Sequence, residues 1–178
     1  MKQEKRTFSR AVTRIRGYVR QMESASSLPM LHETHPVFAK SEGPKLQGVN
    51  LQEPLIDFLE SLNAKLDTLI SFVNQDRLQN EFQETVEVVE LSGGGLKFSS
   101  KKKFKPGDIL EIVLVLSQIP LRLATAVGKI ERDEIMNKRP VWVLEFTNIR
   151  ESDLEAVVAF VFKEEREKIR GQKWGEQP

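Results

Sequence analysis

Apolar and polar residues alternate in short runs through the second half of the chain, and once near its start. Such alternation, with β-branched residues, is typical of β-strands that have one buried face. Turn-forming residues separate the later runs, at Ser92-Gly93-Gly94-Gly95 and at Pro106-Gly107-Asp108. The predicted strands span residues 12–20, 85–91, 96–99, 109–116, 121–131 and 141–146. About six short antiparallel strands favour a β-barrel or a β-sandwich.

A different period predicts two helices. Residues 151–169 place their apolar side chains on one helical face and their charges in the last turns. Residues 51–80 carry apolar residues that step by four and three, which is the a/d pattern of a heptad helix. The residues of this seam are Leu55, Leu59, Leu62, Leu66, Leu69 and Val73.

The heptad seam has two interpretations. The helix packs on its own barrel, or it associates with the same helix of other copies. Six consecutive apolar a/d positions favour a coiled-coil-like homo-oligomer, from dimer to tetramer. Ile56, Phe58, Ile70 and Phe72 widen the apolar surface beyond a two-stranded seam, so we expect burial on more than one side.

The order of these segments predicts a discontinuous barrel. Residues 1–20 and 82–170 form it, and residues 171–178 are a tail. The intervening residues 21–81 hold an irregular, Ser- and Pro-rich connection followed by the heptad helix.

Composition excludes several classes of protein. The 178 residues contain 27 Lys and Arg and 26 Asp and Glu, a balance that argues against a general binder of nucleic acid. There is no cysteine, no apolar signal segment and no apolar run that spans a bilayer, so we expect a cytoplasmic protein. His32 and His35 lie in the irregular connection without a further ligand, so we expect no metal and no cofactor.

Two short motifs, RTFSR at residues 6–10 and ELSGGG at residues 90–95, make the chain resemble the PilZ family of cyclic di-GMP receptors. Residues 6–10 read RTFSR and match the RxxxR motif that precedes the first barrel strand of that family. Residues 90–95 read ELSGGG and are similar to its [D/N]xSxxG motif, on the turn between the next two strands. Glu145-Phe146 and Asn148-Ile149 before the last helix also resemble the family. The inserted helix is similar to a PilZ subgroup that oligomerises through such an insertion.

The resemblance implies a mainly β fold with α-helices: a six-stranded antiparallel PilZ-type barrel, an inserted heptad helix and a C-terminal helix. It also implies an intracellular receptor and not an enzyme. The sequence agrees with the latter, because it has no Cys nucleophile and no carboxylate pair placed by a motif.

The resemblance also implies a ligand site. Arg6 and Arg10 would bind phosphate and guanine, because a guanidinium donates two parallel hydrogen bonds and stacks on bases. Ser92 and Gly95 would contact the ligand at the turn, where glycine lets the backbone approach closely. Lys5 is a further candidate for a phosphate contact.

Two candidate residues have more than one interpretation. Glu90 stands where the family prefers Asp or Asn, and it either accepts a guanine N–H or repels the phosphates. Trp142 either stacks on a base or belongs to the core.

Two functions follow from these motifs. The first is a receptor that couples cyclic di-GMP occupancy to its conformation or to an unidentified downstream protein. The alternative is an oligomeric structural adaptor that has lost nucleotide binding, which Glu90 and the long insertion favour.

Overall fold

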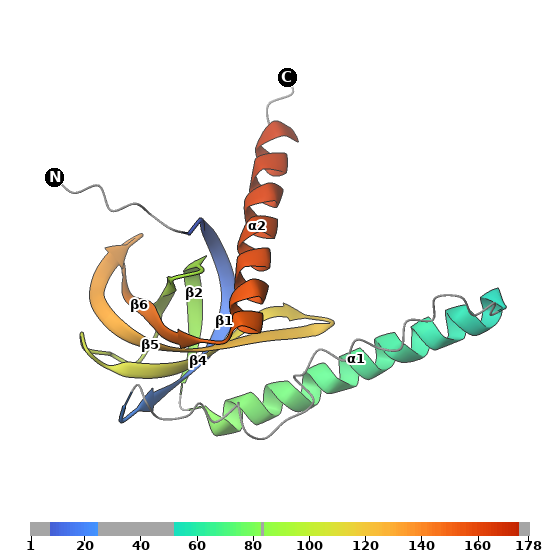
Figure 1. Ribbon diagram of the computed structural model, residues 1–178, viewed down its shortest axis with the longest axis horizontal. Coiled ribbons are helices and arrows are strands. Elements are labelled where there is room, and N and C mark those ends of the chain that lie inside the picture. The colour runs from blue at the N-terminus through green and yellow to red at the C-terminus, as the bar shows by residue number, and fades with distance from the viewer. Residues whose placement is uncertain (1–7, 25–51, 83, 175–178) are drawn as a thin grey trace.

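The computed structural model of the protein describes residues 8–24, 52–82 and 84–174. It contains six strands and two long helices in these ranges (Figure 1). The strands are β1 (Arg10–Met22), β2 (Glu84–Ser92), β3 (Gly95–Ser99), β4 (Ile109–Gln118), β5 (Leu121–Met136) and β6 (Arg139–Ile149). The helices are α1 (Glu53–Glu81) and α2 (Glu151–Trp174).

The six strands close into an antiparallel barrel in the order β1-β2-β3-β6-β5-β4. Strand β1 closes the ring because it pairs with β2 through its first part and with β4 through residues Gly17–Met22. The barrel is therefore built from two segments of the chain with α1 between them. The predicted fold, a six-stranded antiparallel PilZ-type barrel with an inserted helix and a C-terminal helix, is confirmed.

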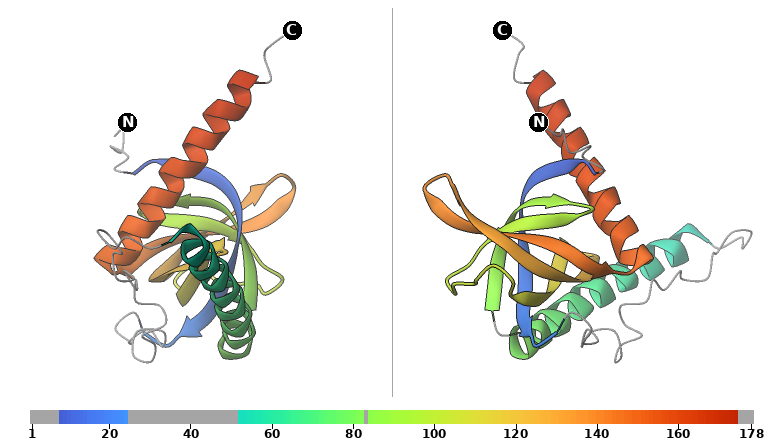
Figure 2. Two further views of the ribbon diagram at one scale, coloured as in Figure 1. Left: turned by 90° about the vertical axis from the view of Figure 1, so that its right-hand side faces the viewer. Right: turned by 60° about the vertical axis from the view of Figure 1, so that its left-hand side comes forward.

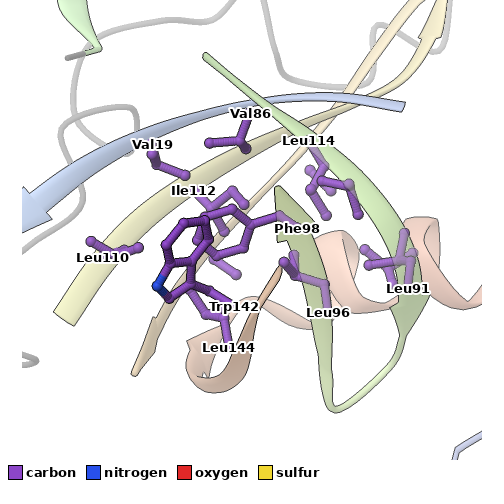
Figure 3. Packing of buried hydrophobic residues seen from close by; sticks show 14 of the residues in the cluster. Val19, Val86, Leu91, Leu96, Phe98, Leu110, Ile112, Leu114, Trp142 and Leu144 are labelled. Carbon is purple, nitrogen blue, oxygen red and sulfur yellow. The ribbon is translucent and has the colours of Figure 1, made fainter. Parts of the chain in front are cut away.

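The barrel interior is a dense hydrophobic core. Phe98 and Trp142 stack at 6.0 Å between ring centroids, and Phe104 meets each of them edge-on. Figure 3 shows these two stacked rings among aliphatic side chains from β1, β2, β4 and β6. Helix α2 adds Val157 and Val161 to the same core. Beyond these residues α2 extends past the barrel (Figures 1 and 2).

Only the C-terminal end of α1 packs on the barrel. Leu78 and Phe82 are buried against Tyr18 of β1 and against Val113 and Val115 of β4, on the outer face of the barrel. Strand β4 is thus covered on both faces, which is why its sequence is apolar without interruption from Ile112 to Val115. The rest of α1 points away from the barrel (Figures 1 and 2).

The heptad seam does not face the barrel. All six seam residues are exposed, from 39% for Leu59 to 68% for Val73. At 3.6 residues per turn, the barrel-facing Leu78 lies about 140° around the helix from Val73. Packing on the protein's own barrel therefore leaves the seam uncovered, and that interpretation of the heptad pattern is wrong for this chain.

The hairpin of β5 and β6 is longer than its sequence pattern predicts. The predicted strands ended at residue 131 and began again at residue 141, but the pairing continues to Met136 and Arg139. Asn137 and Lys138 form the connecting turn with φ of 50° and 64°, as a two-residue type I′ turn requires. The outer part of the hairpin projects beyond the barrel (Figure 2).

Candidate functional site

The glycine-rich turn between β2 and β3 is the centre of the candidate site. The Ser92 hydroxyl donates a hydrogen bond of 3.0 Å to the Gly95 carbonyl and so closes the turn. The Phe146 N–H of β6 donates to the Gly94 carbonyl, also at 3.0 Å. These bonds hold the turn against the rim of the barrel.

Two glycines of the turn, Gly93 and Gly95, serve close contacts. A Cβ atom at Gly95 would lie 2.3 Å from the Leu144 carbonyl oxygen, so only glycine lets β3 approach β6 here. A Cβ atom at Gly93 would lie 2.5 Å from the Phe8 ring. The turn is therefore shaped by its protein neighbours, in addition to any ligand.

Strand pairing brings the motif residues together on the outer face of the barrel. Arg10 of β1 is opposite Ser92, Ser92 is opposite Gly95, and Gly95 is opposite Glu145 of β6. The neighbouring row runs in the same way through Glu90, Lys97, Val143 and Arg132. Residues from five strands thus share one surface, although they are distant in the sequence.

This surface contains a cleft of about 520 Å³, within the size range of small-molecule sites. Of the residues named as candidates from the sequence, it brings together Arg10, Glu90, Ser92 and Gly95. The other lining residues are Phe8, Gly94, Leu96, Lys97, Glu131, Arg132, Val143, Leu144 and Glu145. Arg6 and Lys5 lie outside the described residues.

A chain of ion pairs crosses the cleft. An Arg10 guanidinium nitrogen, Nη1, lies 3.4 Å from Glu90 Oε1, and Lys97 Nζ lies 3.8 Å from the same oxygen. Lys97 Nζ also lies 2.9 Å from Glu134 Oε2, and Arg132 Nη2 lies 2.7 Å from Glu134 Oε1. Hydrogen bonds from Lys97 and then Arg132 hold the pKa of Glu134 below its usual value.

The charges that line the cleft are balanced among the described residues. Three cations, Arg10, Lys97 and Arg132, face three acids, Glu90, Glu131 and Glu145. Arg10 keeps half of its side-chain surface exposed, whereas Lys97 is mostly covered. Arg10 is therefore the cation best placed to exchange its carboxylate partner for an anionic ligand.

Trp142 lies in the core and not in the cleft. It is 5% exposed, and its indole N–H donates a 3.0 Å hydrogen bond to the Phe104 carbonyl. Of the two interpretations of Trp142, the core position is the one found. Stacking on a bound base would require opening the barrel, and Trp142 does not line the cleft.

Sequence reasoning missed Lys97 and Arg132. Lys97 could have been identified from the sequence, because it stands between two buried residues, Leu96 and Phe98, and must point outward. Arg132 could not have been identified in this way, because a β-bulge after Ile130 reverses the alternation of β5 and turns Arg132 onto the outer face. Phe8 was noted only as a spacer within the RxxxR motif.

The described residues were also expected to lack a metal site and a membrane-spanning helix. Within residues 8–24, 52–82 and 84–174, no cluster of His, Asp or Glu side chains is suited to hold a metal ion. His32 and His35 fall outside these ranges. Neither α1 nor α2 has an apolar stretch long enough to cross a membrane.

Comparison with known proteins finds a matching protein family and solved structures with the same fold. A family model described as the PilZ domain matches residues 69–163. No curated protein sequence matches the chain. Among the solved structures that share the fold are two with low sequence identity.

The first is the inhibitor of motility MotI/DgrA of Bacillus subtilis, with a TM-score of 0.52 and 11% identity. That alignment covers 93% of this chain, which spans only 53% of the length of MotI/DgrA. The second is a pathogenic protein of Xanthomonas campestris, described as a tetrameric PilZ domain self-assembled through an unusual helical bundle. Its TM-score is 0.55 and its identity 17%, and the alignment covers 92% of this chain and 91% of the other.

Proposed function

Because the chain belongs to the PilZ family, we propose that it is a receptor for cyclic di-GMP. PilZ domains are non-catalytic and are typically receptors for this nucleotide. The observation that carries the proposal is the meeting of Arg10, Ser92 and Gly95 in one cleft on the outer face of the barrel. These residues come from both motifs, which are about eighty residues apart in the sequence.

The chemistry of the cleft suits a ligand with phosphates and guanine bases. The half-exposed Arg10 guanidinium donates to phosphate oxygens or to guanine O6 and N7. Gly94 and Gly95 are partly exposed and line the cleft, so a base edge can approach the turn there. The family resemblance assigns further ligand contacts to Lys5 and Arg6, which lie outside the described residues.

Glu90 serves as a base acceptor in this proposal. Its carboxylate is flanked by Arg10 and Lys97, which compensate its charge and reduce its repulsion of phosphate. An oxygen of this carboxylate accepts guanine N1–H or N2–H, as the shorter Asp of the family motif would.

Calorimetric titration of cyclic di-GMP tests the receptor function. We expect the wild type to bind, and Arg10→Ala and Ser92→Ala to weaken binding. Arg14→Ala is the matched control, because Arg14 lies on the same strand, is 82% exposed and pairs with Glu87 outside the cleft. Absence of binding by the wild type at tens of micromolar would instead favour the structural adaptor.

The same proposal includes self-association through α1. The exposed seam of six apolar residues is continued by Ile56, Phe58, Ile70 and Phe72, which are also exposed. An apolar surface this wide is typical of a bundle of more than two helices. The Xanthomonas protein assembles as a tetramer through a helical bundle, which supports the same arrangement here.

Light scattering tests the self-association. We expect Leu62→Glu and Leu66→Glu to convert the oligomer to monomers, because each places a charge in the centre of the seam. Ala64→Glu is the control, since it adds the same charge to the face of α1 opposite the seam. A monomeric wild type, or variants with unchanged mass, would refute a bundle built on this seam.

Strand β1 offers a physical route between the two activities. Its first residue, Arg10, lines the cleft, and Tyr18 further along packs against Leu78 of α1. A shift of β1 on nucleotide binding would therefore reach the base of α1. In this way occupancy of the cleft would change the conformation that a downstream protein meets.

A further inference from the structure

The ring of Phe8 covers the glycine turn of the candidate site. A Cβ atom at Gly93 would lie 2.5 Å from one edge of the ring, at Cδ1. A Cβ atom at Gly94 would lie 3.5 Å from the opposite edge, at Cδ2. The ring therefore spans both residues, and a side chain at Gly93 would displace it.

Phe8 also lines the cleft that holds Arg10, Ser92 and Gly95. It remains 42% exposed, so the turn covers only part of its surface. The neighbouring Ser9 hydroxyl donates a 2.7 Å hydrogen bond to Glu165 of α2, which holds this end of the chain near the cleft. The exposed part of the Phe8 ring therefore lies in the same cleft as Arg10, the cation that we assign to phosphate or guanine.

We propose that Phe8 is a stacking platform for a purine base of the bound cyclic dinucleotide, an inference that rests on the proposed receptor function. A base that lies flat on Phe8 leaves its phosphate within the region of Arg10. Every base has a π-face, so an aromatic side chain contributes affinity where an aliphatic one of similar size does not. The glycines at 93 and 94 then have a second purpose, because they provide the seat for the ring.

Calorimetric titration of cyclic di-GMP against Phe8→Leu and Phe8→Tyr tests the platform. Leucine keeps an apolar side chain over the turn and removes the π-face, so we expect affinity to fall about 5- to 150-fold. Tyrosine keeps the ring and should bind within about twofold of the wild type. Thermal unfolding of each variant checks that the barrel is intact.

A double-mutant cycle tests whether the ring acts from its seat. Gly93→Ala should weaken binding as Phe8→Ala does, because the new methyl group displaces the ring. In the Phe8→Ala background, Gly93→Ala should cause little further loss. Fully additive losses of binding free energy would mean that Gly93 acts independently of Phe8. They would refute the claim that Gly93 acts by making room for the Phe8 ring.

Proton NMR of the ligand gives a readout that a purely structural role would not move. The guanine H8 resonance should shift upfield on binding to the wild type and to Phe8→Tyr, and less on binding to Phe8→Leu. If the wild type binds and Phe8→Leu or Phe8→Ala binds as well or better, the platform is refuted while the receptor function stands. If the wild type does not bind at all, both are refuted.

Discussion

Arg10 of β1 and Glu90 of β2 form an ion pair, with 3.4 Å between Arg10 Nη1 and Glu90 Oε1. The pair joins the RxxxR motif to the motif of the glycine-rich turn. Glu90 stays outward because β2 is irregular between Val88 and Glu90 in its pairing with β3. This contact sets the charge that a ligand would meet beside the turn.

Changing Glu90 should alter nucleotide affinity in a graded way. We expect Glu90→Ala to lower affinity for cyclic di-GMP about tenfold, because it removes a guanine acceptor and the partner that orients Arg10. Glu90→Asp, which restores the acid preferred in the family, should bind at least as tightly as the wild type. Glu87→Ala is the calorimetric control, since Glu87 pairs with Arg14 outside the cleft. Tighter binding by Glu90→Ala would show that Glu90 repels the phosphates.

Glu134 should make stability depend on pH in the acid range. Its pKa is lower in the folded protein than its usual value, because Lys97 and then Arg132 donate hydrogen bonds to it. The unfolded chain therefore binds the proton more readily. The stabilisation is present above the usual carboxylate pKa and is lost as pH falls through the lowered value.

We expect Glu134→Gln to flatten this dependence. Urea unfolding of both proteins from about pH 7 to pH 3 measures it, and the two free energies should converge toward the acid end. A difference that is independent of pH would contradict this assignment.

Trp142 should matter for stability and not for ligand contact. Trp142→Ala should destabilise the barrel by about 3–5 kcal/mol, because it leaves a cavity beside Phe98 and an unpaired carbonyl at Phe104. Trp142→Phe should cost less. Urea unfolding measures both, and calorimetry should find nucleotide affinity within about twofold of the wild type for Trp142→Phe. A large loss of affinity in that stably folded variant would place Trp142 in the site.

Substitutions on the two faces of α1 should differ in their effects on stability and on assembly. Leu78→Ala should lower the free energy of unfolding by about 2–5 kcal/mol, because Leu78 is buried on the barrel. Its oligomer should persist, since the seam is unchanged. Leu66→Glu should have the opposite pattern, with lost assembly and a barrel that retains its fold. Light scattering together with circular dichroism distinguishes the two outcomes.

Much of the architecture was predictable from local patterns. The strands and helices follow from periods of two and of three to four residues, and these depend only on which side chains must be buried. The heptad seam was visible because its apolar residues recur with a helical period. That it faces away from the barrel required knowing that Leu78, and not Leu66, meets β4.

The sequence alone determined the barrel strands, the two long helices, the arginine motif and the glycine turn, because each of these is a short-range pattern of residues. Only the tertiary structure decided which charges share the cleft and why Phe8 needs Gly93. Lys97 and Arg132 meet Glu134 through strand register and one bulge in β5, and register depends on how all six strands close the ring. Such contacts join residues far apart in the chain, so no local pattern of residues specifies them.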